Sequence, residues 1–108
     1  MDSDTVILAQ MTPPALTESL LYQVPSTQRA WVEGITVCNR SSNGQSFRIS
    51  ISLLGAPTTL KDYVYFDLPI QSNDTLLAEL DFTMNTTDAI RIFASSVDLS
   101  FTLYGHRS

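Results

Sequence analysis

The stretch VEGITVCNRSSNGQSFRISISLL, residues Val32–Leu54, reads as two β-strands around a polar turn. In its second half apolar and polar residues alternate, with Phe47, Ile49, Ile51 and Leu53 in one set and Arg48, Ser50 and Ser52 in the other. This period of two is typical of a strand with one face on a core and one in water. Because Asn43-Gly44 supplies the positive φ angles of a tight turn, the stretch predicts a β-hairpin.

Short segments rich in β-branched and aromatic residues continue through the chain, separated by Pro, Gly, Asn, Asp and Ser at spacings of roughly 8 to 12 residues. The predicted strands are 5–11, 19–24, 30–38, 46–54, 62–68, 75–82, 89–95 and 98–104. The alternation recurs in Leu76–Phe82 and in Leu99–Leu103. We therefore predict an all-β fold, an antiparallel β-sandwich of about eight strands. A jelly-roll-like arrangement fits better than an immunoglobulin domain, which would often show a Cys, Trp, Cys spacing.

The composition predicts one packed domain over residues 1–108 and excludes several classes of partner. The chain has 108 residues, of which 44% are hydrophobic and 16% charged, and a net charge of -5. Its six lysines and arginines are scattered, which argues against binding nucleic acid or an anionic membrane surface. Since no apolar run approaches a membrane span and the first residues are acidic, we expect no export signal.

No residues with the pattern of a catalytic or metal site stand out. The single cysteine, Cys38, would need a base to become a nucleophile, and the single histidine, His106, is expected in a loose tail. Cys38 follows an apolar strand, which favours a buried or half-buried packing role. Zinc would need about four ligands, and the acidic residues follow no calcium-loop pattern. We predict no enzyme activity, no metal and no cofactor.

The aromatic residues are too many for so small a core, which suggests that some lie on the surface. In the strand around Tyr63 and Tyr65 we expect both tyrosines to point outward, and Val64, Phe66 and Leu68 to face the core. The strand 30–38 is apolar on both faces, with Trp31, Ile35 and Val37 on one and Ala30, Val32 and Cys38 on the other. Either another part of the chain or a second protein would cover the outer face. The predicted interface residues are Trp31, Arg40, Tyr63 and Tyr65.

Four stretches, taken in order, resemble a known family: LYQVPSTQRA at 21–30, VCNRSS at 37–42, YFDLPI at 65–70 and IRIFAS at 90–95. Together they are similar to small β-sandwich virion proteins of tailed bacteriophages, over roughly residues 20 to 105. The resemblance implies a structural role on the particle, as a capsid cement or decoration protein or as part of the neck or tail. It brings no catalytic residues. Residues 1–17 fall outside it and could form an arm that pairs with a neighbouring subunit.

Three hypotheses follow. The first is a cement protein that binds the major capsid protein or another virion protein, assembles as a homo-oligomer with a trimer favoured, and is made in the host cytoplasm before joining the virion. The second is a tail or fibre component that binds a neighbouring virion protein or a host-surface carbohydrate through Trp31 or an outward tyrosine. The third is a small hydrolase built on two of the acidic residues Glu33, Asp62, Asp67, Glu79 and Asp81.

Overall fold

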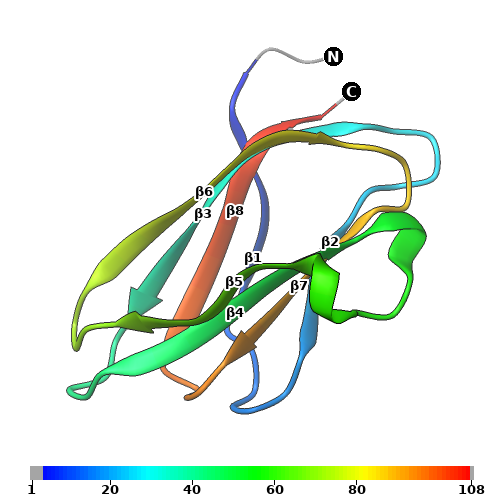
Figure 1. Cartoon of the computed structure of the whole chain (residues 1–108). Coiled ribbons are helices and arrows are strands. Elements are labelled where there is room, and N and C mark those ends of the chain that lie inside the picture. Colours follow the sequence, from blue (N-terminus) through cyan, green and yellow to red (C-terminus); the bar gives the residue numbers. More distant parts are fainter. Residues whose placement is uncertain (1–3, 108) are drawn as a thin grey trace.

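Two antiparallel four-stranded sheets pack face to face in the computed structural model, which describes residues 4–107 (Figure 1). Sheet A has the order β1 (Val6–Met11), β8 (Leu99–Arg107), β3 (Ala30–Asn39) and β6 (Thr75–Met84). Sheet B has the order β2 (Ser19–Gln23), β7 (Ala89–Ala94), β4 (Gln45–Ser52) and β5 (Tyr63–Ile70). The chain crosses between the sheets in the manner of a jelly roll, which is two interleaved Greek keys. The predicted all-β sandwich is therefore confirmed. Because β3 and β4 lie in different sheets and do not pair, the predicted hairpin over residues 32–54 is wrong, and neither Asn43 nor Gly44 has a positive φ.

The core lies between the sheets and is built from the alternating side chains of the long strands. Phe47 of β4 meets Phe101 of β8 edge to face across this gap, with ring centroids 6.0 Å apart. The predicted inward set of β8, Leu99, Phe101 and Leu103, is fully buried. Burying each such side chain stabilises the fold by about 1.5–3 kcal/mol, so these residues fix which face of each strand points inward.

A β-bulge in β3 changes which of its residues face the core. Val32 lies opposite Gly105 and Gly34 opposite Tyr104, so Glu33 is an extra residue in β3. The bulge reverses the alternation, and Ala30 and Val32 therefore point inward together with the later buried residues Ile35 and Val37. Our grouping of Ile35 and Val37 with Trp31 was wrong for this reason. The outer face of β3 carries Trp31, Thr36 and Cys38, all half-buried.

Bulges in β5 likewise change which of its residues face the core, although Tyr63 points outward and Leu68 inward as predicted. Tyr65 lies opposite Ile49 and packs against the core, whereas Phe66 and Val64 are exposed on the outer side. Asp67, with φ of 51°, is the extra residue that lets Leu68 point inward again. The predicted outward direction of Tyr65 and inward directions of Val64 and Phe66 are therefore wrong. Pro69 lies within β5, which is an edge strand where no ladder donor is needed.

Two strand ends differ from the predicted ones in a way that changes the surroundings of their residues. β4 ends at Ser52, and a single 3₁₀ turn, η1 (Leu53–Gly55), follows, so Leu53 is exposed instead of facing the core. A second turn, η2 (Leu60–Asp62), leads into β5. The connection folds over the outer face of sheet B and buries Ser50 and Ser52, which we had expected to meet water. Near the C-terminal end of the described residues, β8 continues to Arg107. His106 is therefore part of a strand, and its predicted place in a loose tail is wrong.

Every edge strand of the sandwich departs from regular pairing. The register shifts in β1 between Ile7 and Ala9, in β2 between Leu20 and Tyr22, in β5 on both sides of Tyr65, and in β6 beside Asp81. Bulged edges are poor templates for an added strand. From the sequence, residues 1–17 could form an arm that pairs with a neighbouring subunit. Within that segment, residues 6–11 pair with β8 of the same chain, and residues 1–3 lie outside the described residues.

Candidate interaction surfaces

The four predicted interface residues lie in four separate places. Trp31 is half-buried on the outer face of sheet A, opposite His106. Tyr63 lies on the outer face of sheet B, against the ring of Phe66. Tyr65 points between the sheets, 6.4 Å from Phe47 by ring centroids. Arg40 lies in the connection from β3 of sheet A to β4 of sheet B, so the fold does not bring these residues together in one site.

The polar residues at the β3–β4 connection form a structural network. Asn39 is buried, and its Nδ2 donates to the carbonyl oxygens of Asn43 and Gln71, at 2.9 and 3.1 Å. Its Oδ1 accepts from the amide and hydroxyl of Ser41. Arg40 donates to Ser100 Oγ and to the carbonyl of Val97, at 3.2 and 3.1 Å. Arg40 therefore holds the β7–β8 connection in place, and these intramolecular hydrogen bonds give it a structural role.

A cluster on the outer face of sheet B, which we call the Arg48 patch, combines aromatic and apolar side chains around one arginine. It consists of Arg48, Tyr63, Val64, Phe66 and Phe93. The Arg48 guanidinium lies 4.3 Å from the ring centroid of Phe66 and 4.5 Å from that of Phe93. Phe66 and Val64 are 54% and 47% exposed, respectively. An arginine between two rings holds them in fixed positions while leaving their outer surfaces open to contact.

Asp67 completes the support of the Arg48 patch. Its Oδ1 lies 2.6 Å from Arg48 Nε, and its Oδ2 accepts from Nη2 at 3.3 Å. This hydrogen bond raises the pKa of Arg48 above its ordinary value. Since the pair is partly exposed, it contributes about 0–1 kcal/mol to stability, and its main effect is to orient the guanidinium. The patch thus has a set shape and a compensated charge.

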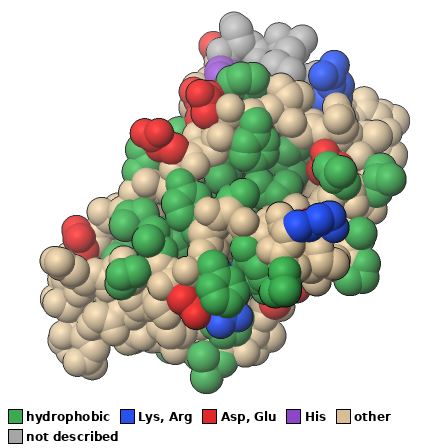
Figure 2. Space-filling view, viewed as in Figure 1, with side chains coloured by type: hydrophobic (Ala, Val, Ile, Leu, Met, Phe, Trp, Pro, Cys, Tyr) green, Lys and Arg blue, Asp and Glu red, His purple; other side chains and the backbone are tan. Residues whose placement is uncertain are grey.

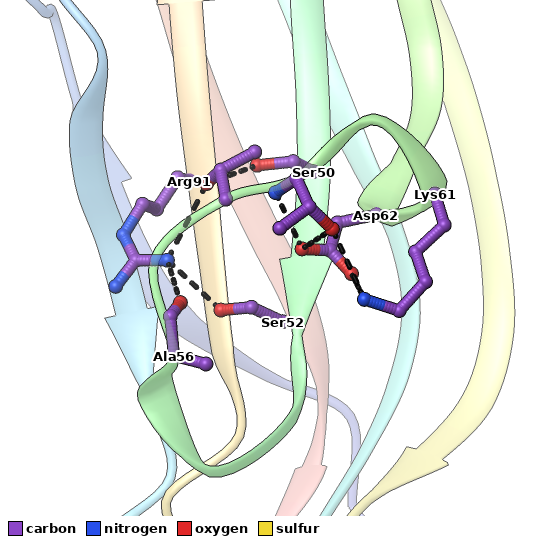
Figure 3. Close-up of polar contacts among 8 residues, drawn as sticks. Ser50, Ser52, Ala56, Lys61, Asp62 and Arg91 are labelled. Atoms are coloured by element: carbon purple, nitrogen blue, oxygen red, sulfur yellow. Dashed lines mark hydrogen bonds and ion pairs between the residues drawn. The ribbon is translucent and has the colours of Figure 1, made fainter.

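The segment Leu53–Asp62, which we call the leucine loop, presents three exposed leucines at the opposite end of β4 from the β3–β4 connection. Leu53, Leu54 and Leu60 are 70%, 76% and 88% exposed. Figure 3 shows Arg91 of β7 reaching the loop, where its Nη1 donates to Ala56 O and Ser52 Oγ, each at 2.8 Å. Nη2 of Arg91 donates to Gly55 O at 3.1 Å. One arginine therefore fastens the loop to the sheet.

The leucine loop is held in an unfavourable backbone conformation as well. Leu54 has φ of 55°, a left-handed conformation that costs a non-glycine residue roughly 1–2 kcal/mol. Its amide donates to Asp88 Oδ1 at 3.0 Å, which compensates part of that cost. A capping box closes the far end of the loop, because Asp62 Oδ2 accepts from the amide of Thr59 at 2.8 Å. This bond lowers the pKa of Asp62 below its ordinary value.

The hydrogen bonds of Arg91, Asp88 and Asp62 hold the leucine loop rigidly while its leucines stay exposed. Rigidly held, exposed leucines are typical of a contact surface.

Sheet A carries a hollow on its outer face, which we call the acidic hollow. It has a volume of about 290 Å³ and is lined by Glu33, Leu77, Glu79, Asp81 and Tyr104. A Cβ at Gly34 would lie 3.0 Å from both Leu77 Cδ1 and Tyr104 Oη, so the missing side chain lets these two residues form the floor. The structure brings together three of the five acidic residues that we had considered for a hydrolase, whereas Asp62 and Asp67 lie with the leucine loop and the Arg48 patch.

Cys38 and His106 lie far apart on the outer face of sheet A. Cys38 is near the end of β3, and His106, in the neighbouring strand β8, lies beside the start of β3. Cys38 is opposite Ser100, and His106 is opposite Trp31, seven positions earlier in the strand. At about 3.3 Å per residue, the two side chains are separated by roughly 20 Å. The nearest acid to His106 is Glu33, with Nε2 and Oε2 3.7 Å apart. Among residues 4–107, no three His, Cys, Asp or Glu side chains are placed to hold a metal, and no helix could cross a membrane.

Apart from Tyr63, which was a predicted interface residue, the residues of the Arg48 patch and the leucine loop were not predicted from the sequence to form a contact surface. Strict alternation along β5 places Phe66 on the same face as Leu68, in the core. The extra residue at Asp67 breaks that alternation, and the sequence pattern does not reveal it. A usable signal was present at Leu53-Leu54-Gly55, where consecutive leucines before a glycine break the alternation at the end of the strand. Comparisons of the chain with protein-family models, with curated proteins and with solved structures give no match. None of these comparisons tests the resemblance to phage virion proteins, which is an expectation from the sequence motifs.

Proposed function

We propose that this chain is a non-enzymatic structural protein of a tailed-phage virion, a capsid cement protein that binds the major capsid protein. The sheet order supports a particle role, because jelly rolls recur in viral capsid proteins, although one fold serves many functions. The separation of Cys38 from His106 supports a role without nucleophilic catalysis.

The observation that carries the proposal is the Arg48 patch. An exposed phenylalanine beside a fixed arginine is the composition found at the energetic centres of protein interfaces, where Tyr, Trp and Arg are enriched. Its charge is already compensated by Asp67, so binding would bury mainly apolar surface. A contact of about 800 Å² on this chain would give an interface of standard size.

Sedimentation with assembled capsids tests the proposal. The purified protein is mixed with capsids that lack it, the capsids are pelleted, and the bound protein is measured against concentration. We expect saturable binding in a fixed ratio to the capsid subunits, and capsids that break at a higher temperature when occupied. Absence of binding to capsids, with a folded protein, would overturn the role.

A pair of exposed apolar variants locates the contact. Phe66→Ala should weaken capsid binding by about 30-fold, the effect of losing a hot-spot residue of about 2 kcal/mol. Val97→Ala is the matched control, because Val97 is 56% exposed and lies in the β7–β8 connection, away from the patch. Equal binding by both variants would exclude the Arg48 patch as the contact.

A tail or fibre role remains the second candidate because Trp31 lies on the outer face of sheet A, where no strand of the described chain covers it. An indole that is open on one side is a surface on which a sugar ring can stack. A glycan array with the wild type and Trp31→Ala separates the two roles. Binding of one sugar class that is lost in Trp31→Ala, with no capsid binding, would favour the fibre role.

A further inference from the structure

The acidic hollow and the leucine loop expose charges of opposite sign. The acidic hollow on sheet A has three carboxylates, whereas the leucine loop carries Lys61, whose side chain is 83% exposed. Figure 2 shows acidic side chains along the upper-left side of the molecule, whereas the basic side chains in this view lie on the right and at the lower centre, with acidic ones near them. Copies of a chain with a net charge of -5 repel one another, and a contact that places Lys61 against the acidic hollow would offset part of that repulsion.

Two carboxylates of the acidic hollow have no partner within the described part of the chain. The carboxylates of Glu79 and Asp81 have no hydrogen bond or ion pair there, and both residues are exposed. Glu33 accepts from Thr5 Oγ1 at 2.9 Å and is the one carboxylate of the hollow beside an ionisable base, His106. The floor of Leu77 and Tyr104 is apolar, and Leu77 is 49% exposed. A partner that fits would present one apolar side chain with a cation beside it.

The tip of the leucine loop has that composition. Leu60, the most exposed of its leucines, directly precedes Lys61. Lys61 Nζ donates to Thr59 Oγ1 at 3.0 Å and lies 3.9 Å from Asp62 Oδ1, but its side chain is 83% exposed, so a second copy can reach the ammonium group. Because the capping box and Arg91 already hold the loop in place, little conformational entropy would be lost when it docks.

We propose that the leucine loop of one copy docks into the acidic hollow of a second copy. Leu60 packs on Leu77 and Tyr104, and Lys61 lies against Glu79. Since the two surfaces differ, the contact is heterologous, and it closes into a ring when the rotation between copies allows. The bulged edge strands are consistent with joining copies through faces instead of through an added strand. This association does not depend on capsid binding.

Sedimentation equilibrium of the purified full chain, without capsids, tests the proposal. The wild type should form a closed oligomer whose dissociation increases with salt, because the contact includes a charge pair. Lys61→Glu should raise the dissociation constant about 10-fold or more, since a like charge would then face Glu79. A wild type that stays monomeric at every concentration measured would overturn the proposal, and so would a Lys61→Glu variant that assembles normally.

A charge swap supplies the matched control. Lys61→Glu combined with Glu79→Lys should restore assembly to within a few-fold of the wild type. Lys61→Glu combined with Glu18→Lys has the same net charge, but Glu18 is an exposed residue ahead of β2 and outside the hollow. This second variant should remain dissociated. Equal assembly by the two double variants would show that net charge, and not the proposed contact, controls association. Circular dichroism confirms that each variant is folded.

Discussion

Tyr65 of β5 donates its hydroxyl hydrogen to the carbonyl oxygen of Glu79 in β6, at 2.8 Å. The two strands belong to different sheets and form the edges of the sandwich on one side. This bond therefore joins the sheets at an edge where the strands themselves do not pair. It also explains why Tyr65 points inward, since its ring packs on the core while its hydroxyl reaches the facing strand.

Tyr65→Phe should destabilise the protein by about 0.5–1.5 kcal/mol, the net contribution of one hydrogen bond. Urea unfolding followed by circular dichroism measures the change. Tyr104→Phe is the control, because the Tyr104 hydroxyl makes no hydrogen bond among the described residues. A loss of equal size in both variants would contradict a specific role for the bond between Tyr65 and Glu79.

Gly105→Ala should destabilise the fold by about 1–3 kcal/mol or more, because a Cβ at this position would overlap the carbonyl oxygen of Trp31 in the neighbouring strand. Gly44→Ala is the comparison, since its nearest atom would be the carbonyl oxygen of Ile70 at 3.9 Å. Thermal unfolding of both variants measures the difference. Equal stability of Gly105→Ala and Gly44→Ala would contradict the close approach of β8 to the carbonyl oxygen of Trp31 in β3.

Arg91→Ala should release the leucine loop from sheet B. The substitution removes the donors to Ala56 O, Gly55 O and Ser52 Oγ, at an expected cost of about 1–3 kcal/mol. Amide hydrogen exchange should become faster in residues 53–62 and remain slow in β8. Arg48→Met serves as the control, because Arg48 lies on the same sheet face without a bond to the loop. Unchanged exchange in Arg91→Ala would show that other contacts hold the loop.

Acid should open the capping box of η2. The pKa of Asp62 is lowered in the folded state, so the stability that it contributes is complete above its unfolded pKa of about 3.9. That contribution is lost as the pH falls through the lower folded value. We expect the amide resonance of Thr59, which donates to Asp62, to shift below about pH 4, and this shift to be absent in Asp62→Asn. A resonance that shifts between pH 5 and 7 instead would contradict the assignment.

Much of the fold follows from the sequence alone because strands with one buried face leave an alternating pattern. Phe47 and Ile49 of β4, and Leu99 and Phe101 of β8, were predicted to face the core and do so. The pattern fails where one extra residue enters a strand, as at Glu33 and Asp67, since the neighbouring strand that defines the bulge lies far away in the sequence.

The candidate surfaces were less predictable for the same reason. Tyr63 was correctly expected on the outer face, but the exposure of Phe66 beside Arg48 depends on the bulge. Likewise, Ser50 and Ser52 look solvent-exposed in the pattern and are covered by a loop that Arg91 fastens from another strand. Which residues cover a face is decided by contacts between distant segments, and alternation within one strand carries no information on them.

The buried amide of Asn39 has a consequence for how the molecule unfolds. Asn39 ends a strand of sheet A, while the carbonyl groups that it binds belong to the β3–β4 and β5–β6 connections, both of which pass between the sheets. Separating the sheets at this end would leave a desolvated amide without acceptors, which costs more than the bonds themselves contribute. Partly opened states are therefore penalised, and the two halves of the sandwich should melt as a single cooperative unit.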